Sequence, residues 1–352
     1  MTAQLRPPPD EAATTRLVRL LPGITLAALV GLVSLGIAAL EARAFGHAII
    51  EGLVVAILLG MVVRSLRPLP PRLEAGVSFT ATQVLEVAVL LLGASVDLAL
   101  LLRAGPALAV GIVLLVVLGI GASYGIGRAM RLPHKLAVLV ACGNSICGNS
   151  AIAAVAPVIR AERAHVASSI AFTAILGVVV VVGLPFLMTP LGLNDFQYGV
   201  LAGLTVYAVP QVLAATFPVS VLAGQVGTLV KLVRVLMLGP VVLFFALRHR
   251  HDGGAATGAA PRFAITRFVP WFVIGFLLLA ALRAIGVIPR AAAAPLATVS
   301  SWLTVAAMAA LGLGVDLRTL GRVGRPVILT VTASLLVLVA LGVTLIHSLS
   351  IR

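Results

Sequence analysis

The amino-acid sequence predicts an all-α membrane protein, and three observations support this prediction. Hydrophobic residues make up 61% of the 352 residues, and charged residues only 10%. The mean hydropathy is +1.18, and such a chain has too little polar surface to cover a soluble globule. The apolar residues are also gathered into stretches that approach the roughly 20 residues a helix needs to cross a bilayer.

Eleven apolar stretches follow one another along the chain. They run near residues 20–40, 47–63, 77–96, 104–127, 135–159, 165–188, 196–217, 220–247, 266–285, 295–316 and 325–348. Because lipid offers no water to unpaired backbone groups, each stretch is expected to be a helix. The sequence therefore predicts about 11 transmembrane helices within a single domain over residues 16–348.

Two polar stretches lie outside these spans. Residues 1–15 contain three consecutive prolines and lack a signal-peptide pattern, so they are expected to form a disordered cytoplasmic tail. Residues 249–262 are rich in glycine and are expected to form a flexible cytoplasmic linker between the eighth and ninth spans.

The distribution of Lys and Arg predicts how the helices are oriented, because short cytoplasmic loops are enriched in basic residues. With the N-terminus in the cytoplasm, sixteen Lys and Arg residues fall on the inner side and seven on the outer side. The two that remain, Lys231 and Arg234, lie inside the eighth span. The chain is therefore expected to be a multi-pass protein of the bacterial inner membrane with a cytoplasmic N-terminus.

An internal repeat supports this topology. Residues Ala88–Gly105 align without gaps with Ala307–Gly324, and nine of the eighteen positions are identical. Asp97 is placed at the outer end of the third span, whereas its equivalent, Asp316, is placed at the inner end of the tenth. One motif at opposite faces of the membrane is typical of the inverted-topology repeats of secondary transporters; the alternative is two helix ends that are similar by coincidence. The predicted halves and the central segment between them are about residues 16–127, 225–348 and 128–220.

The composition and the motifs argue against several other classes of protein. The net charge of +14 raises nucleic acid as a partner, but the basic residues form small groups between apolar runs instead of one face with interleaved aromatic residues. Cys142 and Cys147 lack the spacing of a zinc site or a disulfide framework and are expected to be free thiols. The sequence also lacks a metal constellation, a cofactor motif and a nucleophile with its base. We therefore expect no enzyme activity, no cofactor, no metal and no nucleic-acid partner.

A polar, glycine-rich segment within the fifth span is the strongest candidate for a binding site. Two Gly-Asn-Ser units follow each other at a spacing of five residues: Gly143, Asn144, Ser145, Gly148, Asn149 and Ser150. Because this spacing does not continue one face of a helix of period 3.6, a break in the span is expected. A helix that begins at mid-membrane exposes N–H groups that favour an anion, and the Asn and Ser side chains add neutral donors. The alternative is ordinary packing of small residues between helices.

The seventh span contains a second interruption. Thr205, Tyr207 and Gln211 lie beside Pro210, and proline lacks a backbone donor and kinks or ends a helix. A pair of interrupted helices, one in each half of a chain, is the usual sign of a transporter's binding site. These three side chains are therefore further candidates for binding a solute.

Two cations lie in the middle of the eighth span. Lys231 and Arg234 are three residues apart and so lie on one face of the helix. A cation at the bilayer centre costs at least about 2.5–3.5 kcal/mol, and such residues usually face the bundle interior or a cavity. The pair is expected to supply positive charge to an anion site; the alternatives are a salt bridge to Glu86 in the third span, or snorkelling to an interface. If Glu86 pairs with either cation, its protonation could couple transport to protons.

Four segments carry a resemblance to a known family: Cys142–Ala154, Ala171–Thr173, Gln211–Ala215 and Val230–Val235. They resemble the bacterial sulfate exporter family of polytopic membrane proteins, which is related to the bile acid, arsenite and riboflavin transporter group. The resemblance implies inverted repeats with crossing, broken helices, and a panel beside a mobile transport unit. That family carries a His-Asp pair in the seventh span where this chain has Tyr207 and Ala208, so coupling assigned to that pair does not carry over.

Together, the residues and the resemblance predict a secondary active transporter that exports a small anion, such as sulfate or a sulfonate, by alternating access. The expected ligands are the polar side chains of the two interrupted spans, with the two cations supplying charge. The alternatives are an anion channel or an anion sensor embedded in the membrane. The expected partners are the anion and the lipid bilayer, and proton coupling and a homodimer are further options.

Overall fold

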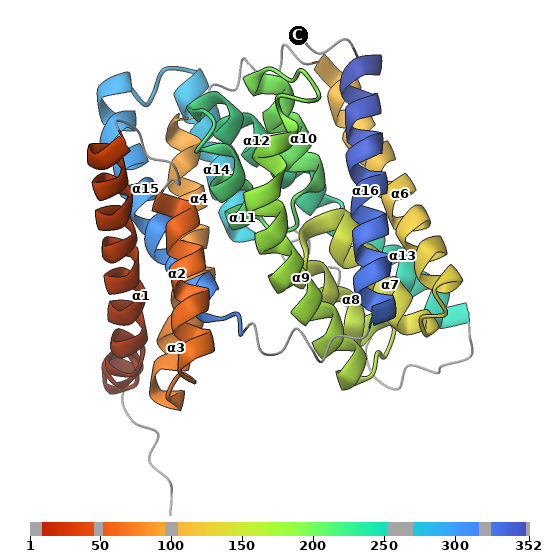
Figure 1. Cartoon of the computed structure of the whole chain (residues 1–352), viewed down its shortest axis with the longest axis horizontal. Coiled ribbons are helices and arrows are strands. Elements are labelled where there is room, and N and C mark those ends of the chain that lie inside the picture. Colours follow the sequence, from red (N-terminus) through yellow and green to blue (C-terminus); the bar gives the residue numbers. More distant parts are fainter. Residues whose placement is uncertain (1–8, 46–51, 96–104, 252–269, 317–324, 350–352) are drawn as a thin grey trace, which may run out of the picture. The chain divides into compact units, whose positions relative to one another are not determined.

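The computed structural model describes residues 9–45, 52–95, 105–251, 270–316 and 325–349, which form helices and turns without a strand (Figure 1). The all-α prediction is therefore confirmed for this part of the chain. A helix or a pair of helices lies in each of the predicted apolar stretches. Within the described residues, six helices are long and apolar enough to cross a membrane by length and composition. The count of about 11 crossings stays a prediction.

The chain divides into two compact units, of which the first comprises Met1–Val89 and Thr298–Leu317. Its described elements are α1 (Pro9–Phe45), α2 (Gly52–Leu66), α3 (Pro71–Phe79), the π-helical η1 (Thr80–Val84), the start of α4 (Leu85–Leu92) and the end of α15 (Arg290–Leu313). Glycine lets α1 and α3 touch, because a Cβ on Gly76 would lie 2.0 Å from the carbonyl oxygen of Leu20. Small residues at close crossings are typical of membrane helices.

The second unit comprises Leu90–Ala297 and Arg318–Arg352. Besides parts of α4 and α15, its described elements are η2 (Gly93–Ser95), α6 (Gly105–Ala129), α7 (His134–Cys142), η3 (Gly143–Cys147), α8 (Asn149–Val158), α9 (Arg163–Gly183), η4 (Leu184–Leu187), α10 (Asp195–Thr205), α11 (Val209–Thr216), α12 (Val221–Leu236), α13 (Leu238–His251), α14 (Trp271–Ala284) and α16 (Arg325–Ser348). This unit contains both of the predicted interrupted spans.

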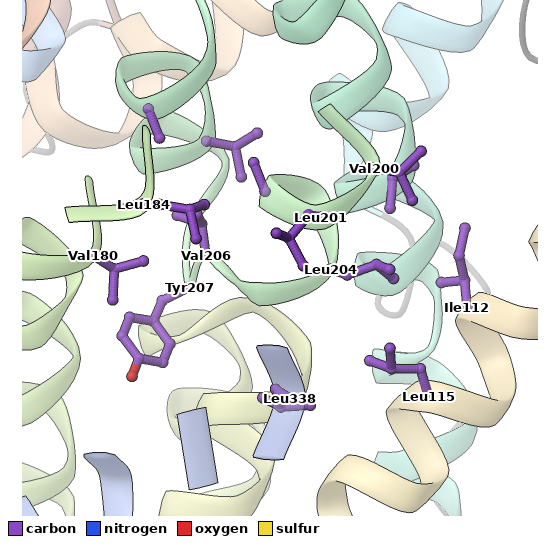
Figure 2. Packing of buried hydrophobic residues seen from close by; sticks show 14 of the residues in the cluster. Ile112, Leu115, Val180, Leu184, Val200, Leu201, Leu204, Val206, Tyr207 and Leu338 are labelled. Carbon is purple, nitrogen blue, oxygen red and sulfur yellow. The ribbon is translucent and has the colours of Figure 1, made fainter. Parts of the chain in front are cut away.

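The core of the second unit positions the interrupted helices. Leu201 and Leu204 of α10 belong to one apolar cluster with Ile112 of α6 and Leu338 of α16 (Figure 2). Leu201 also lies against Gly342, since a Cβ there would be 3.0 Å from its Cδ1 atom. The helix α10 is thus held by apolar packing on the side where it meets α16.

Two predicted boundaries differ from the observed helices. The helix α1 begins at Pro9, inside the stretch 1–15 that the sequence predicts to be a disordered tail. Proline is favoured in the first turn of a helix because that turn needs no N–H from it. Residues 1–8 lie outside the described residues. The helix α13 likewise takes in the start of the predicted linker 249–262, and the remainder of the linker lies outside the described residues.

In the first compact unit, the end of α15 packs with the N-terminal helices. Glycine makes this packing close: a Cβ on Gly312 of α15 would lie 2.1 Å from the carbonyl oxygen of Ile57 in α2. Asp97 and residues 317–324 of the repeated motif lie outside the described residues. The inverted repeat therefore stays a prediction at this stage.

Candidate functional site

The first interrupted span breaks at Gly148. The helix α7 runs into the π-helical turn η3, whose last N–H bond runs from Gly148 to the carbonyl of Gly143 at 2.9 Å. Gly148 then takes φ 67° and ψ −125°, a conformation that only glycine adopts without strain. The helix α8 begins at the next residue, Asn149. The predicted break in the Gly-Asn-Ser segment is confirmed.

The second interrupted span breaks between Thr205 and Val209. The helix α10 ends at Thr205, the backbone is extended at Val206 and Ala208, and α11 begins at Val209 with Pro210 in its first turn. Proline suits that position because the first N–H groups of a helix lack carbonyl partners. The side chain of Gln211 turns back and accepts a hydrogen bond from the backbone of Ala208 at 3.2 Å. The predicted interruption of the seventh span is confirmed as well.

The two breaks meet each other. A Cβ on Gly148 would lie 3.4 Å from the Cβ of Tyr207, so the two broken segments touch at these residues. The ammonium of Lys231 donates to the carbonyls of Ile146 and Val206, both at 2.7 Å, and so bonds one carbonyl from each break. The side chain of Tyr207 packs edge-on against Phe172 of α9 at a centroid separation of 6.3 Å. Residues that are about sixty positions apart therefore form one crossing.

Arg234 completes this connection. Its guanidinium donates to the carbonyl of Ser145 from Nε at 3.2 Å, to those of Gly203 and Val206 from Nη1 at 2.9 and 3.4 Å, and to that of Asn144 from Nη2 at 3.2 Å. These carbonyls end the first half of each broken helix, where the last turn of a helix lacks N–H partners and carries partial negative charge. The two cations of α12 therefore stabilise two helix C-termini at once.

This arrangement decides between the alternatives for the two cations. Both are fully buried and hydrogen-bonded, so snorkelling to an interface is wrong. Both side chains face the interior of the second unit. Glu86 belongs to the first unit, and its pairing with Lys231 or Arg234 stays a prediction. The direct partners of the cations are carbonyl groups, so a role as anion ligands also stays a prediction.

The two Gly-Asn-Ser units lie in different environments. Asn149 and Ser150, in the first turn of α8, are exposed, whereas Asn144 and Ser145 are fully buried. The amide nitrogen of Asn144 donates to the hydroxyl of Ser123 on α6 at 3.1 Å. Within the doublet, the accessible polar residues are therefore those of the second unit, at the N-terminus of α8, and the first unit is part of the packing against α6.

Of the remaining predicted site residues, Thr205 and Gly143 have structural partners. Thr205 donates to the carbonyl of Leu201 at 2.7 Å and is fully buried. Gly143 packs against Ile152 of α8, because a Cβ there would lie 2.9 Å from its Cδ1 atom. The hydroxyl of Tyr207 is buried and has no hydrogen-bond partner in the described part of the chain.

Two residues of α9 belong to the site although the sequence argument did not select them. Thr173 donates to the side-chain oxygen of Asn149 and fixes the orientation of that amide. Gly177 leaves room for Gln211, since a Cβ there would lie 2.1 Å from its amide nitrogen. Thr173 falls in one of the four segments that carry the family resemblance, and this was the signal that could have identified it.

Metal-binding side chains and the cysteines were the other groups to consider at this crossing. Within the described residues, no three His, Cys, Asp or Glu side chains group together in a way that could hold a metal ion. Cys142 and Cys147 are free and buried, as predicted. The crossing instead offers a helix N-terminus with neutral polar side chains.

Comparison with known proteins places the chain in a family. The family model described as conserved hypothetical protein 698 matches residues 22–331. The chain belongs to the UPF0324 membrane protein family. A UPF0324 membrane protein of Brucella melitensis is 52% identical over 337 residues, which is 96% of this chain and 93% of that protein. One from Bradyrhizobium diazoefficiens is 51% identical over 336 residues, 95% of each chain.

The UPF0324 family also reaches more distant bacteria. A member from Bacillus cereus is 33% identical over 297 residues, 84% of each chain. No solved structure gives a significant match. Membership in the UPF0324 family and the apolar helices together identify the chain as a membrane-embedded protein. The narrower resemblance to sulfate exporters and to the bile acid transporter group stays a prediction.

Proposed function

We propose that this UPF0324 protein is a secondary active transporter that exports a small anion, such as sulfate or a sulfonate, by alternating access. The observation that carries the proposal is the crossing of two broken helices. The second halves of these helices, α8 and α11, begin next to the two breaks, which touch each other. The first halves end at carbonyls that accept hydrogen bonds from Lys231 and Arg234. Broken helices that meet at mid-membrane are the usual construction of a transporter's binding site.

The charge distribution at the crossing favours an anion. Lys231 and Arg234 occupy the negative ends of α10 and of the α7–η3 segment. The N-termini of α8 and α11 remain and carry partial positive charge. At α8 the first N–H groups lack helical partners, and Asn149 and Ser150 are exposed beside them. Such an N-terminus binds sulfate, phosphate or carboxylate groups without further charged side chains.

The bridge made by the two cations favours a carrier over a channel. Lys231 bonds a carbonyl of each break, and Arg234 spans the same two segments. Because both breaks are tied to α12, they are expected to move as one body when access alternates. A channel would instead require a continuous open path past the crossing.

Internal symmetry supports the architecture of a carrier. A Cβ on Gly93 would lie 2.3 Å from the carbonyl oxygen of Phe276, and a Cβ on Gly312 would lie 2.1 Å from that of Ile57. The offset from 93 to 312 and from 57 to 276 is 219 residues in both cases, so exchanging each residue with its equivalent turns the first contact into the second. Two-fold related repeats exchange contacts in this way.

The same offset recurs in the helix boundaries. The helices α2 and α6 begin at Gly52 and Gly105, and α14 and α16 begin at Trp271 and Arg325, within one residue of the shifted positions. A Cβ on Gly119 would lie 2.6 Å from Leu338, which is its own equivalent at this offset. Contact between a residue and its own equivalent, here within the second unit, is a pattern that two-fold related segments produce. With eleven crossings, spans one to four would correspond to spans eight to eleven in inverted orientation.

The setting of this transporter follows from the same reasoning. We place it in the bacterial inner membrane, with a cytoplasmic N-terminus, because Lys and Arg are then concentrated on the cytoplasmic side. It acts without catalysing a reaction, without a cofactor and without nucleic acid. The anion and the lipid are its partners, and a homodimer through the less mobile helices is compatible with the proposal.

Transport can be tested with the full-length protein in proteoliposomes. Vesicles loaded with unlabelled sulfate, thiosulfate or taurine are diluted into the labelled anion, and accumulation against the gradient by counterflow is measured. A carrier gives counterflow, whereas a channel gives only equilibration, and a sensor gives neither. Absence of both fluxes for every anion would refute transport.

The site can be tested in the same vesicles. Asn149→Ala removes a neutral donor and is expected to lower anion affinity by about 10- to 100-fold, the effect of about 1.5–3 kcal/mol for a hydrogen bond to a charged group. Asn194→Ala is the matched control, because Asn194 caps α10 by accepting from the backbone of Gln197 at 2.9 Å and lies away from the crossing in sequence. Equal affinity in both variants would remove Asn149 from the site.

A further inference from the structure

A row of polar side chains runs along one face of α9 towards the crossing. His165, Ser169 and Thr173 are spaced by four residues and so lie above one another on the helix. The last of them donates to the side-chain oxygen of Asn149, in the first turn of α8. Three polar residues on one face of a largely apolar helix are costly in lipid and are usually functional.

Two members of this row, and Tyr207 at the second break, have buried groups without hydrogen-bond partners in the described residues. In the described part of the chain, the Nδ1 atom of His165, the hydroxyl of Ser169 and the hydroxyl of Tyr207 are buried and make no hydrogen bond. Tyr207 reaches the same helix through its ring contact with Phe172. Buried polar groups without protein partners are ordinarily satisfied by ordered water. Water beside α9 would satisfy these three groups.

The row begins at the surface and ends at the proposed site. The residues that lead into α9 include Arg160 and Glu162, both exposed, and His165 lies in its first turn. From His165 to Thr173 the helix rises by about 12 Å. His165 is the outermost member of the row and the one that carries an imidazole.

We propose that His165 couples protons to anion binding at the N-terminus of α8, through the hydrated row that it forms with Ser169 and Thr173. The inference rests on the transport function proposed above. One proton passes from bulk water to the neutral imidazole, giving the imidazolium, and returns to bulk water on release; the anion itself is not protonated. The imidazolium needs an acceptor for its buried Nδ1–H, which water between it and the Ser169 hydroxyl provides.

The direction of the hydrogen bonds fits this role. A hydroxyl accepts one hydrogen bond and donates another, so donors along the row point from His165 towards Asn149 when the imidazole is charged. The hydroxyl of Thr173 has two acceptors within reach, the side chain of Asn149 and the carbonyl of Ile170 at 2.9 Å. When the hydroxyls of the row donate towards Asn149, Thr173 bonds the side-chain oxygen of Asn149 in preference to the carbonyl of Ile170. The amide nitrogen of Asn149 is then oriented for an anion.

The other charged groups around α9 are few. The elements that pack against it are α7, α8, α11, α16, η3 and η4. Of these, α8, α11 and η4 have no titratable side chain. The titratable or charged residues of the remaining elements, and those at the start of α9 itself, are His134, Lys135, Cys142, Cys147, Arg325, His347, Glu162 and Arg163, with Tyr207 at the break.

Two of these groups already have partners. His134 is hydrogen-bonded to the hydroxyl of Tyr124 at 2.9 Å, and Lys135 donates to the carbonyl of Arg160 at 2.8 Å. His134 is therefore the matched histidine for a control. It lies at the start of α7 and is exposed, outside the row.

The size of the coupling follows from the geometry. If the rise of about 12 Å along α9 is taken as the separation between the imidazolium and the anion, one positive charge at an effective dielectric constant of about 20 changes the anion affinity by about tenfold. By linkage, an anion that binds tenfold more tightly to the protonated protein also raises proton affinity tenfold. A carrier with this property moves an anion together with a proton.

The first experiment measures proton and anion movement together in proteoliposomes that enclose a pH-sensitive dye. For the wild type, inward sulfate flux is expected to acidify the lumen, and its apparent affinity is expected to rise about tenfold from pH 8 to pH 5.5. His165→Gln is expected to lose both the acidification and the rise in affinity, while His134→Gln keeps them. Unchanged pH dependence in His165→Gln would overturn the proposal.

The second experiment probes the hydrated row without any transport. In a Cys142→Ala, Cys147→Ala background, Ser169→Cys is expected to react with a small methanethiosulfonate reagent, whereas Val178→Cys, at a buried apolar position of the same helix, is not. An unreactive Ser169→Cys overturns the row. A reactive Ser169→Cys in a protein that moves no anion would instead overturn the transport function, and with it the coupling.

Discussion

Replacing Lys231 by methionine separates a structural role of the buried cation from a role as an anion ligand. Methionine keeps the length and apolar character of the side chain but removes both hydrogen bonds of 2.7 Å. The carbonyls of Ile146 and Val206 then lie buried without their donor. Each orphaned group costs about 1–3 kcal/mol, so the free energy of unfolding is expected to fall by about 2–6 kcal/mol.

A role of Lys231 as an anion ligand alone predicts a different effect on stability. If the ammonium served the anion only, removing an isolated buried charge would leave stability unchanged or raise it. The assay is thermal and denaturant unfolding of the purified protein in detergent, combined with anion binding to the same sample. Arg283→Met is the matched control, because Arg283 donates to the carbonyl of Ile288 at 3.0 Å from a partly buried position at the end of α14. A Lys231→Met protein as stable as the wild type, but unable to bind anion, would refute the structural reasoning.

Two sets of glycine substitutions test the break at Gly148 and the close helix contacts at Gly93 and Gly312. Gly148→Ala is expected to destabilise the protein by about 1–3 kcal/mol, because alanine is strained at φ 67° and ψ −125°; Gly192→Ala, at φ 61° with open space around it, should cost no more than this in the same unfolding assay. Gly93→Ala and Gly312→Ala are expected to cost similar amounts, since each would force a methyl group into a facing carbonyl; Gly36→Ala, which meets nothing within 4 Å, should raise stability by about 0.5–1 kcal/mol. Very different losses of stability in Gly93→Ala and Gly312→Ala would speak against equivalent repeats.

The sequence predicted the helices and both breaks because each depends on local chemistry. Apolar stretches can only be helical in lipid, Gly148 interrupts the helical period, and Pro210 cannot continue a helix from the preceding turn. These features need no knowledge of neighbouring segments. The same holds for Lys231 and Arg234, whose position three apart on an apolar span predicted that they point together into the interior.

The partners of these residues could not be predicted in the same way. That the two cations bond carbonyls of both breaks depends on how α12 lies against η3 and α10, which no local pattern determines. In the sequence, the two Gly-Asn-Ser units look equivalent. In the structure, the residues Asn149 and Ser150 of the second unit are exposed at the start of α8, whereas Asn144 of the first unit is buried and bonds Ser123 of α6. The repeat offset of 219 residues was visible in sequence, but its exchanged contacts required coordinates.

A final substitution tests the direction of the electrostatic field at α8. Asn149→Asp is nearly isosteric and puts a negative charge in the first turn of the helix, which stabilises that helix by about 0.3–1 kcal/mol through its dipole. The same charge repels a bound anion about 4 Å away by about 4 kcal/mol at an effective dielectric constant of 20, close to a thousandfold loss of affinity. Stability and anion binding therefore change in opposite directions. Asn194→Asp, at the N-cap of α10, shares the first effect and should leave binding intact.

The contrast between these two variants isolates the proposed site from the general physics of helix ends. Both place a carboxylate at a helix start in the same unit, so any effect on folding or insertion is matched. Only at α8 does the carboxylate replace a donor beside the crossing of the broken helices. Anion uptake by Asn149→Asp at the wild-type rate would mean that the anion passes elsewhere, and the positive ends of the broken helices would then serve packing alone.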